Sequence, residues 1–308
     1  MKLSSHAEQQ PGVAMHVSTG ANLSHRRLGH VGIKSLNVLR KVEGSGISFD
    51  GTLPPCDVCA LSKSKRHPYP RTADYKVNTP FKLVLGDFTG PIVPAAMGGY
   101  SYVSKITDQH AKYRVVYLAK TKSDALSTIQ TFVKSVVIPM GLRVQRLCTE
   151  KGGDCKGQEF EDYCLSTGIR HEYASTNTPQ QVGVSERDGG ILAPMTRCLL
   201  KDSELPPFLW GELMFTAAYL LNRVPHSALD MVTPYKKLYG NDANLSHLRV
   251  IGARAFVHVE IHTKKMAEKA WEGSLCGYSP KSKSYRIYNP ATKRVVESRN
   301  VVFIETPL

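Results

Sequence analysis

The chain lacks a long hydrophobic run. Its longest apolar stretch, LWGELMFTAAYLL at residues 209–221, is interrupted by Glu212 and is shorter than the roughly 20 apolar residues that a membrane-spanning helix needs. The opening residues MKLSSHAEQQPG contain no apolar stretch, which argues against a secretory segment. The seven cysteines are odd in number and do not suggest a disulfide framework. These absences predict a protein of the cytoplasm, the nucleus or both, neither secreted nor held in a membrane.

Acidic residues are scarce relative to basic ones. The 308 residues include 40 Lys and Arg against 26 Asp and Glu, a formal net charge of +14. Residues 61–82 carry six Lys or Arg against one Asp, and residues 248–308 carry eleven against five Glu. An excess of this kind favours a polyanionic partner but does not define a fold. A generic basic protein remains the alternative explanation of the charge.

The length and composition allow several small domains. A chain of 308 residues has room for two or three domains of ordinary size, and its 42% of hydrophobic residues can fill real cores. Residues 1–20 are polar, and we expect them to be disordered. The motifs that follow place three units, at residues 21–72, 75–240 and 245–308.

Two histidines and two cysteines near the N-terminus have the spacing of a zinc site. Four residues separate His25 from His30, 25 residues follow, and two residues separate Cys56 from Cys59. Zn²⁺ takes four nitrogen or sulfur ligands in a closed tetrahedron. The segment is too small to bury a sufficient core alone, so a metal would contribute much of its folding. The alternative is two surface histidines and two free thiols.

Three acidic residues stand at the ends of predicted elements. Asp87 closes the apolar run 81–88, Glu150 closes an alternating run, and Glu186 opens a segment with helical spacing. Phosphodiester transfer uses two divalent cations about 3.5–4 Å apart, and Mg²⁺ and Mn²⁺ prefer carboxylate oxygens. We therefore expect the three carboxylates to converge on a metal site. The alternative is that acids simply end strands and begin helices, where Glu complements the helix dipole.

The pattern between these acids predicts a mixed α/β unit. Apolar runs that end in Gly or Pro are typical of strands, and apolar residues three and four apart are typical of helices. We expect strands at 81–88, 100–107, 113–119, 143–149 and 169–174, and helices at 123–138, 158–166, 185–201 and 207–222. The last helix would be buried, and either Ser203 or Pro206–Pro207 would begin it.

Four motifs resemble those of the integrases of copia-type long-terminal-repeat retrotransposons. HRRLGHVGIKSL from His25 and CDVCALSKSKRHPY from Cys56 are similar to the family's zinc-binding pre-integrase region. TEKGGDC at 149–155 and PQQVGVSERDGGI at 179–191 are similar to the motifs around its second and third catalytic acids. The resemblance extends over about residues 25–305. It implies an α/β chain with an RNase H-like integrase core, an N-terminal helical zinc module and a C-terminal small β-barrel-like domain.

The resemblance also implies a function. The family's members are DNA integrases, polynucleotidyl transferases and endonucleases, which bind DNA ends and join them to target DNA by two-metal transesterification. Asp87, Glu150 and Glu186 would hold Mg²⁺ or Mn²⁺, DNA would be the partner, and the chain would form a homo-oligomer. No reverse-transcriptase signature such as YVDD and no protease signature DTG or DSG occurs. We expect an integrase-region piece of a polyprotein or a stand-alone descendant.

Departures from the family's motifs predict weakened or lost catalysis. Glu150 stands where the family has Asp, and one methylene moves a carboxylate by about 1 Å, a misplacement that can cost about 10²-fold in rate. Lys151 and Val182 each replace an Asn, and a cation beside a carboxylate competes with a metal.

The helix expected to present the third acid contains unfavourable residues. Gly189, Gly190 and Pro194 lie inside it, and both residue types destabilise helix interiors. A catalytically dead DNA-binding or scaffold protein derived from an integrase is therefore the alternative function. A free-standing RNase H-like nuclease is a poorer third, because such an enzyme needs neither the zinc module nor the basic C-terminal segment.

The C-terminal segment, residues 248–305, consists of short β-like runs separated by turns. Its tyrosines stand among basic residues that would suit contact with a phosphate backbone. They are Tyr278, Tyr285 and Tyr288, with Lys281, Lys283 and Arg286 between them. The alternative is that these are ordinary strand tyrosines, because strands favour Tyr.

Overall fold

The computed structural model describes most of the chain. The described residues are 20–47, 49, 51–63, 77–150, 155, 157–173, 179–259, 266–280 and 282–305, and of residues 179–189 only the backbone. The disorder expected for residues 1–20 therefore falls, apart from Gly20, outside the described residues.

The N-terminal module consists of three short helices, α1 (Ala21–Arg27), α2 (Ile33–Leu39) and α3 (Asp57–Lys63). A left-handed turn separates the first two, with Gly29 at φ 67° and His30 at φ 65°. A side chain at Gly29 would meet Cε of Met195 at 2.1 Å, so this position requires glycine. The turn sends the chain back toward α1 and fixes where His30 lies.

The central unit is a five-stranded mixed sheet, as the sequence predicted. Its strand order is β3-β2-β1-β4-β5. The first three strands pair antiparallel, and β4 and β5 run parallel to β1. The strands are β1 (Leu83–Thr89), β2 (Tyr102–Asp108), β3 (Arg114–Ala119), β4 (Arg146–Thr149) and β5 (Arg170–Tyr173). Each lies within three residues of its predicted bounds.

Helices α4 (Ala125–Phe132) and α5 (Gln158–Thr167) share one hydrophobic cluster with the sheet. A 3₁₀ turn at Lys122–Asp124 leads into α4, and a π turn at Val133–Val137 and a 3₁₀ turn at Ile138–Met140 follow it. The predicted helix 123–138 is therefore confirmed but is not regular throughout.

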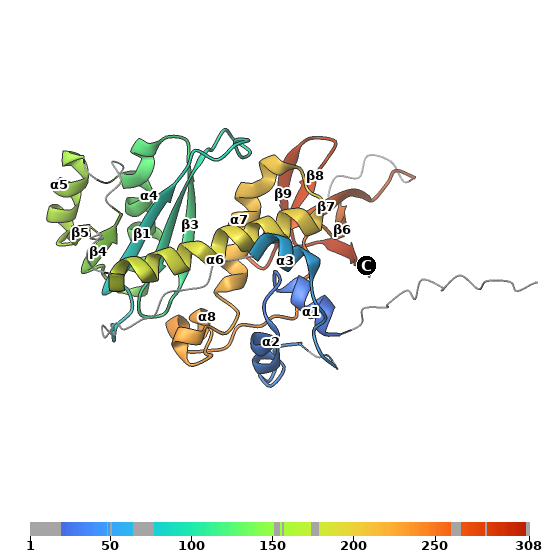
Figure 1. Cartoon of the computed structure of the whole chain (residues 1–308). Coiled ribbons are helices and arrows are strands. Elements are labelled where there is room, and N and C mark those ends of the chain that lie inside the picture. The colour runs from blue at the N-terminus through green and yellow to red at the C-terminus, as the bar shows by residue number, and fades with distance from the viewer. Residues whose placement is uncertain are drawn as a thin grey trace, which may run out of the picture.

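The long helix α6 (Pro179–Ser203) begins six residues before its predicted start at 185. It continues through the two glycines and Pro194 as one helix, and it crosses the molecule from β1 and β4 to α3 (Figure 1). A 3₁₀ turn at Pro207–Leu209 then begins α7 (Trp210–Leu221), with no side-chain cap from Ser203. A short 3₁₀ turn at Ser227–Leu229 and α8 (Pro234–Tyr239), which the sequence reading missed, complete the helical part.

The C-terminal segment folds as a five-stranded antiparallel sheet of order β10-β6-β7-β8-β9. Among the described residues, β9 and β10 lie at the two ends of this order, and closure of the sheet into the expected barrel stays a prediction. The strands are β6 (Arg254–His258), β7 (Ala270–Tyr278), β8 (Tyr285–Asn289), β9 (Arg294–Ser298) and β10 (Val301–Ile304).

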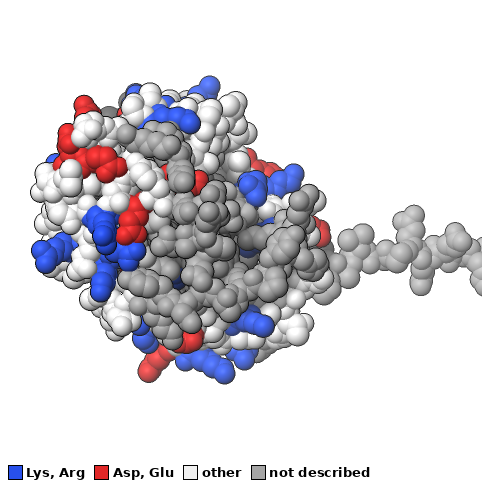
Figure 2. Space-filling model, turned by 60° about the vertical axis from the view of Figure 1, so that its left-hand side comes forward, with Lys and Arg blue, Asp and Glu red and all other residues white. Residues whose placement is uncertain are grey.

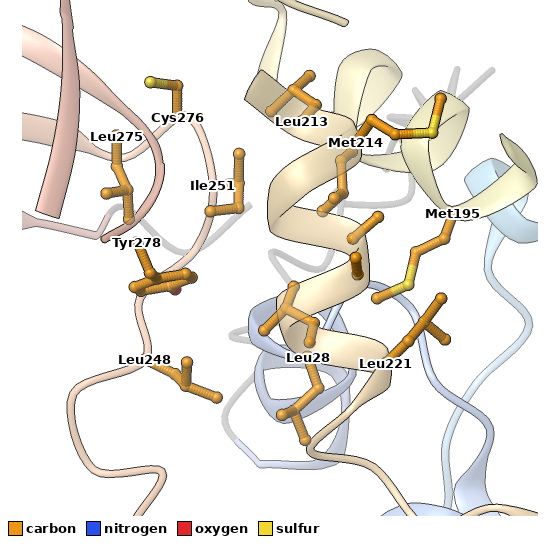
Figure 3. Packing of buried hydrophobic residues seen from close by; sticks show 14 of the residues in the cluster. Leu28, Met195, Leu213, Met214, Leu221, Leu248, Ile251, Leu275, Cys276 and Tyr278 are labelled. Carbon is orange, nitrogen blue, oxygen red and sulfur yellow. The ribbon is translucent and has the colours of Figure 1, made fainter. Parts of the chain in front are cut away.

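Helix α7 is the centre of a core that joins three parts of the chain. Its buried side chains lie between Leu28 of the N-terminal module, Met195 of α6 and Leu275 of β7 (Figure 3). Arg286 of β8 adds two hydrogen bonds of 2.7 Å to the Glu212 carboxylate of α7. The N-terminal module, α6 and the C-terminal sheet are thereby packed around one helix.

Within the described residues, no helix combines the length and the apolar character needed to cross a membrane.

Candidate metal sites

The four residues predicted to bind zinc converge. His25 lies in α1, His30 in the turn after it, Cys56 immediately before α3 and Cys59 within it. Nε2 of His25 is 3.4 Å from Sγ of Cys59, Nδ1 of His30 is 3.4 Å from Sγ of Cys56, and the two nitrogens are 3.2 Å apart. All four donor atoms lie within 4.8 Å of one another.

These distances suit a tetrahedral ion. Zinc bonds of about 2.0–2.1 Å to nitrogen and about 2.3 Å to sulfur place neighbouring ligand atoms roughly 3.3–3.8 Å apart. Both histidine rings are buried, and the two cysteines are partly exposed. The donor types and their spacing therefore fit Zn²⁺ with little rearrangement.

The two donors with shifted pKa values differ in readiness for a metal: the His25 ring is ready to bind, whereas the Cys59 thiol must first lose its proton. Nδ1 of His25 is 2.6 Å from the carbonyl oxygen of Val31, which leaves Nε2 directed at the thiols. Burial lowers the pKa of His25 to about 4 despite that hydrogen bond, so the ring is neutral near pH 7. Burial raises the pKa of the Cys59 thiol to about 12. The Cys59 proton would leave only in exchange for a cation, as happens when zinc binds.

Asp87 and Glu150 line one pocket, as the sequence predicted for two of the three acids. Asp87 lies in β1 and Glu150 directly after β4. These strands run parallel, with Gly86 paired to Thr149, so the two acids occupy the next position on each strand. Ser104, Ala125 and Cys155 are among the other residues of the pocket. Adjacent parallel strands thus bring carboxylates 63 positions apart to the same edge of the sheet.

The third predicted acid, Glu186, lies within α6, but its side chain is outside the described residues. Helix α6 packs against β1, and its first half lies near β1 and β4 in Figure 1. The convergence of Glu186 with the other two acids stays a prediction.

A lysine that the sequence reading missed pairs with Asp87. Lys105 of β2 is directly opposite Asp87 in the antiparallel register, and its Nζ forms an ion pair with the Asp87 carboxylate. Oγ1 of Thr89 lies 3.3 Å and 3.4 Å from the two carboxylate oxygens. Only 14% of the Lys105 side chain and 20% of the Asp87 side chain are exposed. Lys105 therefore competes with a divalent cation for one of the two oxygens of this carboxylate.

The cation expected to compete with a metal, Lys151, lies outside the described residues. Lys105 carries no sequence signal for this role, because its position opposite Asp87 depends on the register of two strands. Only the pairing of β1 with β2 reveals it.

Two of the three tyrosines of the C-terminal sheet are buried and are not available for contact with a phosphate backbone. Tyr278 is 5% exposed, and its hydroxyl donates to the carbonyl of Arg249 and accepts from the same residue's N–H. Tyr288 is also buried, and the hydroxyl of Tyr285 donates to the carbonyl of His247. The alternative of ordinary strand tyrosines is correct for Tyr278 and Tyr288, because burial removes both from solvent.

The chain matches known proteins over most of its length. A family model described as "Retroviral polymerase SH3-like domain" matches residues 253–308. The retrovirus-related Pol polyprotein from transposon TNT 1-94 of Nicotiana tabacum is 35% identical over 286 residues, which are 92% of this chain and 22% of that protein. The Pol polyprotein from transposon RE2 of Arabidopsis thaliana is 27% identical over 91% of this chain and 19% of its own length.

Solved integrase structures show a weaker likeness. The HTLV-2 integrase catalytic core domain in complex with magnesium, in its trimeric form, has a TM-score of 0.41 and 20% identity, covering 54% of this chain and 100% of that one. The chain spans only about a fifth of the length of the two polyproteins that it matches. It nevertheless belongs with the copia-type, retrovirus-related Pol polyproteins of retrotransposons, to which it is related over about nine tenths of its own length.

Proposed function

We propose that this chain is the integrase region of such a polyprotein, a DNA-joining enzyme with an RNase H-like core and a structural zinc module. The observation that carries the proposal is the shared pocket of Asp87 and Glu150 at the ends of neighbouring parallel strands. The predicted arrival of Glu186 on α6 would complete a cage of three carboxylates. Its substrates would be the ends of a linear DNA copy and a target DNA.

The three carboxylates would hold two Mg²⁺ or Mn²⁺ ions, which activate the attacking oxygen and stabilise the leaving oxygen of a phosphodiester. Asp87 contributes from a rigid strand, and Glu150 from the residue after one. A cation that bound the Asp87 oxygen paired with Lys105 would displace the lysine. Its freed ammonium group would then lie beside the pocket, where it suits a DNA phosphate.

Binding of DNA would rest on many contacts. On the face shown in Figure 2, the Lys and Arg residues form several separate groups with acidic residues among them. Affinity would therefore come from phosphate contacts distributed over the molecule, and from the basic segment 61–82 as well. We also propose that the chain acts as a homo-oligomer, so that two DNA ends can be held together.

The second candidate function is a catalytically dead DNA-binding or scaffold protein. Two observations favour it: the Glu at position 150 where the family has Asp, and the Lys105 ion pair that already satisfies Asp87. Such a protein would keep the zinc module and the positive charge without transferring strands.

One pair of assays separates the two functions. Strand transfer of a labelled oligonucleotide is measured with Mn²⁺, next to a gel shift with the same DNA. Joining that disappears in Asp87→Asn supports the enzyme. DNA binding with no joining at any Mn²⁺ concentration supports the scaffold, and absence of both contradicts the proposal.

A further inference from the structure

A buried carboxylate stands behind the predicted zinc site, outside its four ligands. Asp202 lies in the last turn of α6, and 8% of its side chain is exposed. One of its oxygens is 3.7 Å from Nε2 of His30, whose side chain is 1% exposed. The two residues are 172 positions apart in the sequence.

The orientation of the His30 ring directs its second nitrogen, Nε2, toward Asp202. Nδ1 of His30 faces Cys56 and His25, so it is the nitrogen that would bind the metal. A neutral imidazole that binds through Nδ1 carries its proton on Nε2. Within the described structure, that Nε2 is buried and has no hydrogen-bond partner at normal distance. A buried N–H without an acceptor is unfavourable, and Asp202 is the carboxylate beside it.

We propose that Asp202 is a positioning residue for zinc: it accepts the Nε2–H of His30 and holds the ring with Nδ1 toward the ion. This inference rests on the zinc site proposed above. With zinc bound, the carboxylate would hold this N–H, and its charge would make the imidazole a stronger ligand. Metal-bound histidines commonly donate their second N–H to a carboxylate in this way.

Arg26 allows the carboxylate to be buried there. Its Nε lies 3.1 Å and 3.2 Å from the two oxygens of Asp202. Arg26 is not a ligand itself, and it directly follows the ligand His25 in α1. A zinc ion with two thiolates and two neutral imidazoles has no net charge, and Arg26 balances Asp202. The whole buried group is therefore neutral, which limits the cost of removing these charges from water.

The arrangement connects the zinc site to the helix that carries Glu186. Cys198 of α6 lies 3.8 Å from the carbonyl oxygen of Val58 in α3, so α3 and α6 already touch beside the metal. Asp202 would add a polar link from the same helix to a ligand. Loss of zinc would then loosen the C-terminal end of α6 as well as the N-terminal module.

The test measures zinc affinity of the full chain by competition with a chromophoric chelator. We expect Asp202→Ala to weaken zinc binding by about 10- to 100-fold, the range for outer partners of metal-bound histidines. Asp202→Asn, which keeps an acceptor oxygen but loses the charge, should lie between Asp202→Ala and the parent. Replacement of zinc by Co²⁺ should give a shifted visible spectrum in Asp202→Ala, because the His30 ring is less well held.

Arg27→Gln is the matched control. It removes the neighbouring ion pair of α1, with Glu305, without touching a zinc ligand, and its zinc affinity should equal that of the parent. Equal zinc affinity in Asp202→Ala and parent, or an equal loss in Arg27→Gln, would overturn the role of Asp202. If the parent itself binds no zinc, the zinc site fails and this inference fails with it.

Discussion

The two predicted metal sites differ in how far the fold has prepared them. At the zinc site, four donor atoms already lie within 4.8 Å of one another, and hydrogen bonding directs His25 toward the thiols. At the carboxylate site, two acids line a pocket, but Lys105 occupies Asp87 and the third acid must arrive from α6. The two proposed roles account for this difference: a structural ion needs a closed site, whereas catalytic ions must exchange and must leave room for substrate.

The largest effect is expected when one of the four predicted zinc ligands is removed. The parent should bind about one Zn²⁺ per chain, and Cys56→Ser should bind less than about half an equivalent, because a closed site needs all four ligands. The N-terminal module should then lose protection from hydrogen exchange. Atomic absorption measures the zinc. Cys164→Ser, at a buried thiol far from the module, is the control; unchanged zinc in Cys56→Ser would contradict the assignment.

Reversal of the departures in the carboxylate site should restore activity. Glu150→Asp with Lys151→Asn, and then Pro194→Ala, should raise Mn²⁺-dependent joining by up to about 10²-fold, since a misplaced catalytic group can cost that much. Adding Asp87→Asn should abolish the gain, because the ligands act as a unit. A triple revertant that binds DNA normally but shows no metal-dependent cleavage would favour the scaffold function.

Removal of Lys105 should leave the Asp87 carboxylate free to bind a metal, as the donors of the zinc site are. Lys105→Met should tighten Mn²⁺ binding about tenfold, because a hydrogen bond to a charged group is worth about 1.5 kcal/mol. Titration followed by electron paramagnetic resonance measures the affinity. Lys134→Met, at an exposed lysine, should change nothing. Weaker Mn²⁺ binding in Lys105→Met would show that the lysine supports the site instead of blocking it.

The smallest effect is expected for DNA affinity when the carboxylate site is altered. Asp87→Asn should bind DNA within about threefold of the parent, because phosphate contacts by Lys and Arg dominate affinity. The affinity of both proteins should fall at least about tenfold between 50 mM and 200 mM salt. Fluorescence anisotropy at several salt concentrations measures this. An affinity that stays constant over that range would refute an ionic mode of binding.

Local patterns in the sequence were sufficient for much of the fold. The bounds of the five central strands were predicted to within three residues, and Gly90 after β1 and Gly152 shortly after β4 helped to place two of their ends. The four candidate zinc donors, which the structure brings together, could be picked out because ligand type and spacing are local properties. The start of α6 was predicted six residues late, since Pro179 in a motif with Gly183 reads as loop, although Pro is well tolerated in the first turn of a helix.

Other features depend on contacts between distant segments. The sequence suggested that the tyrosines near Lys283 form a DNA-contacting surface, because the composition of a strand does not reveal which of its faces is packed against the rest of the protein. The packing of β7 against α7 decided that Tyr278 is buried. Likewise, the short β-like runs of the C-terminal segment predicted a small β domain, but only strand pairing gave the order β10-β6-β7-β8-β9 of the described sheet.

The sequence by itself determined the chemistry this protein has available: two histidines and two cysteines with zinc spacing, and three acids at the ends of elements. The tertiary structure decided what stands next to these groups. Lys105 reaches Asp87 through strand register, and Asp202 reaches His30 from 172 positions away. The physical reason is that ligand spacing is set along the chain, whereas the charges that tune a ligand act through space and depend on how the elements pack.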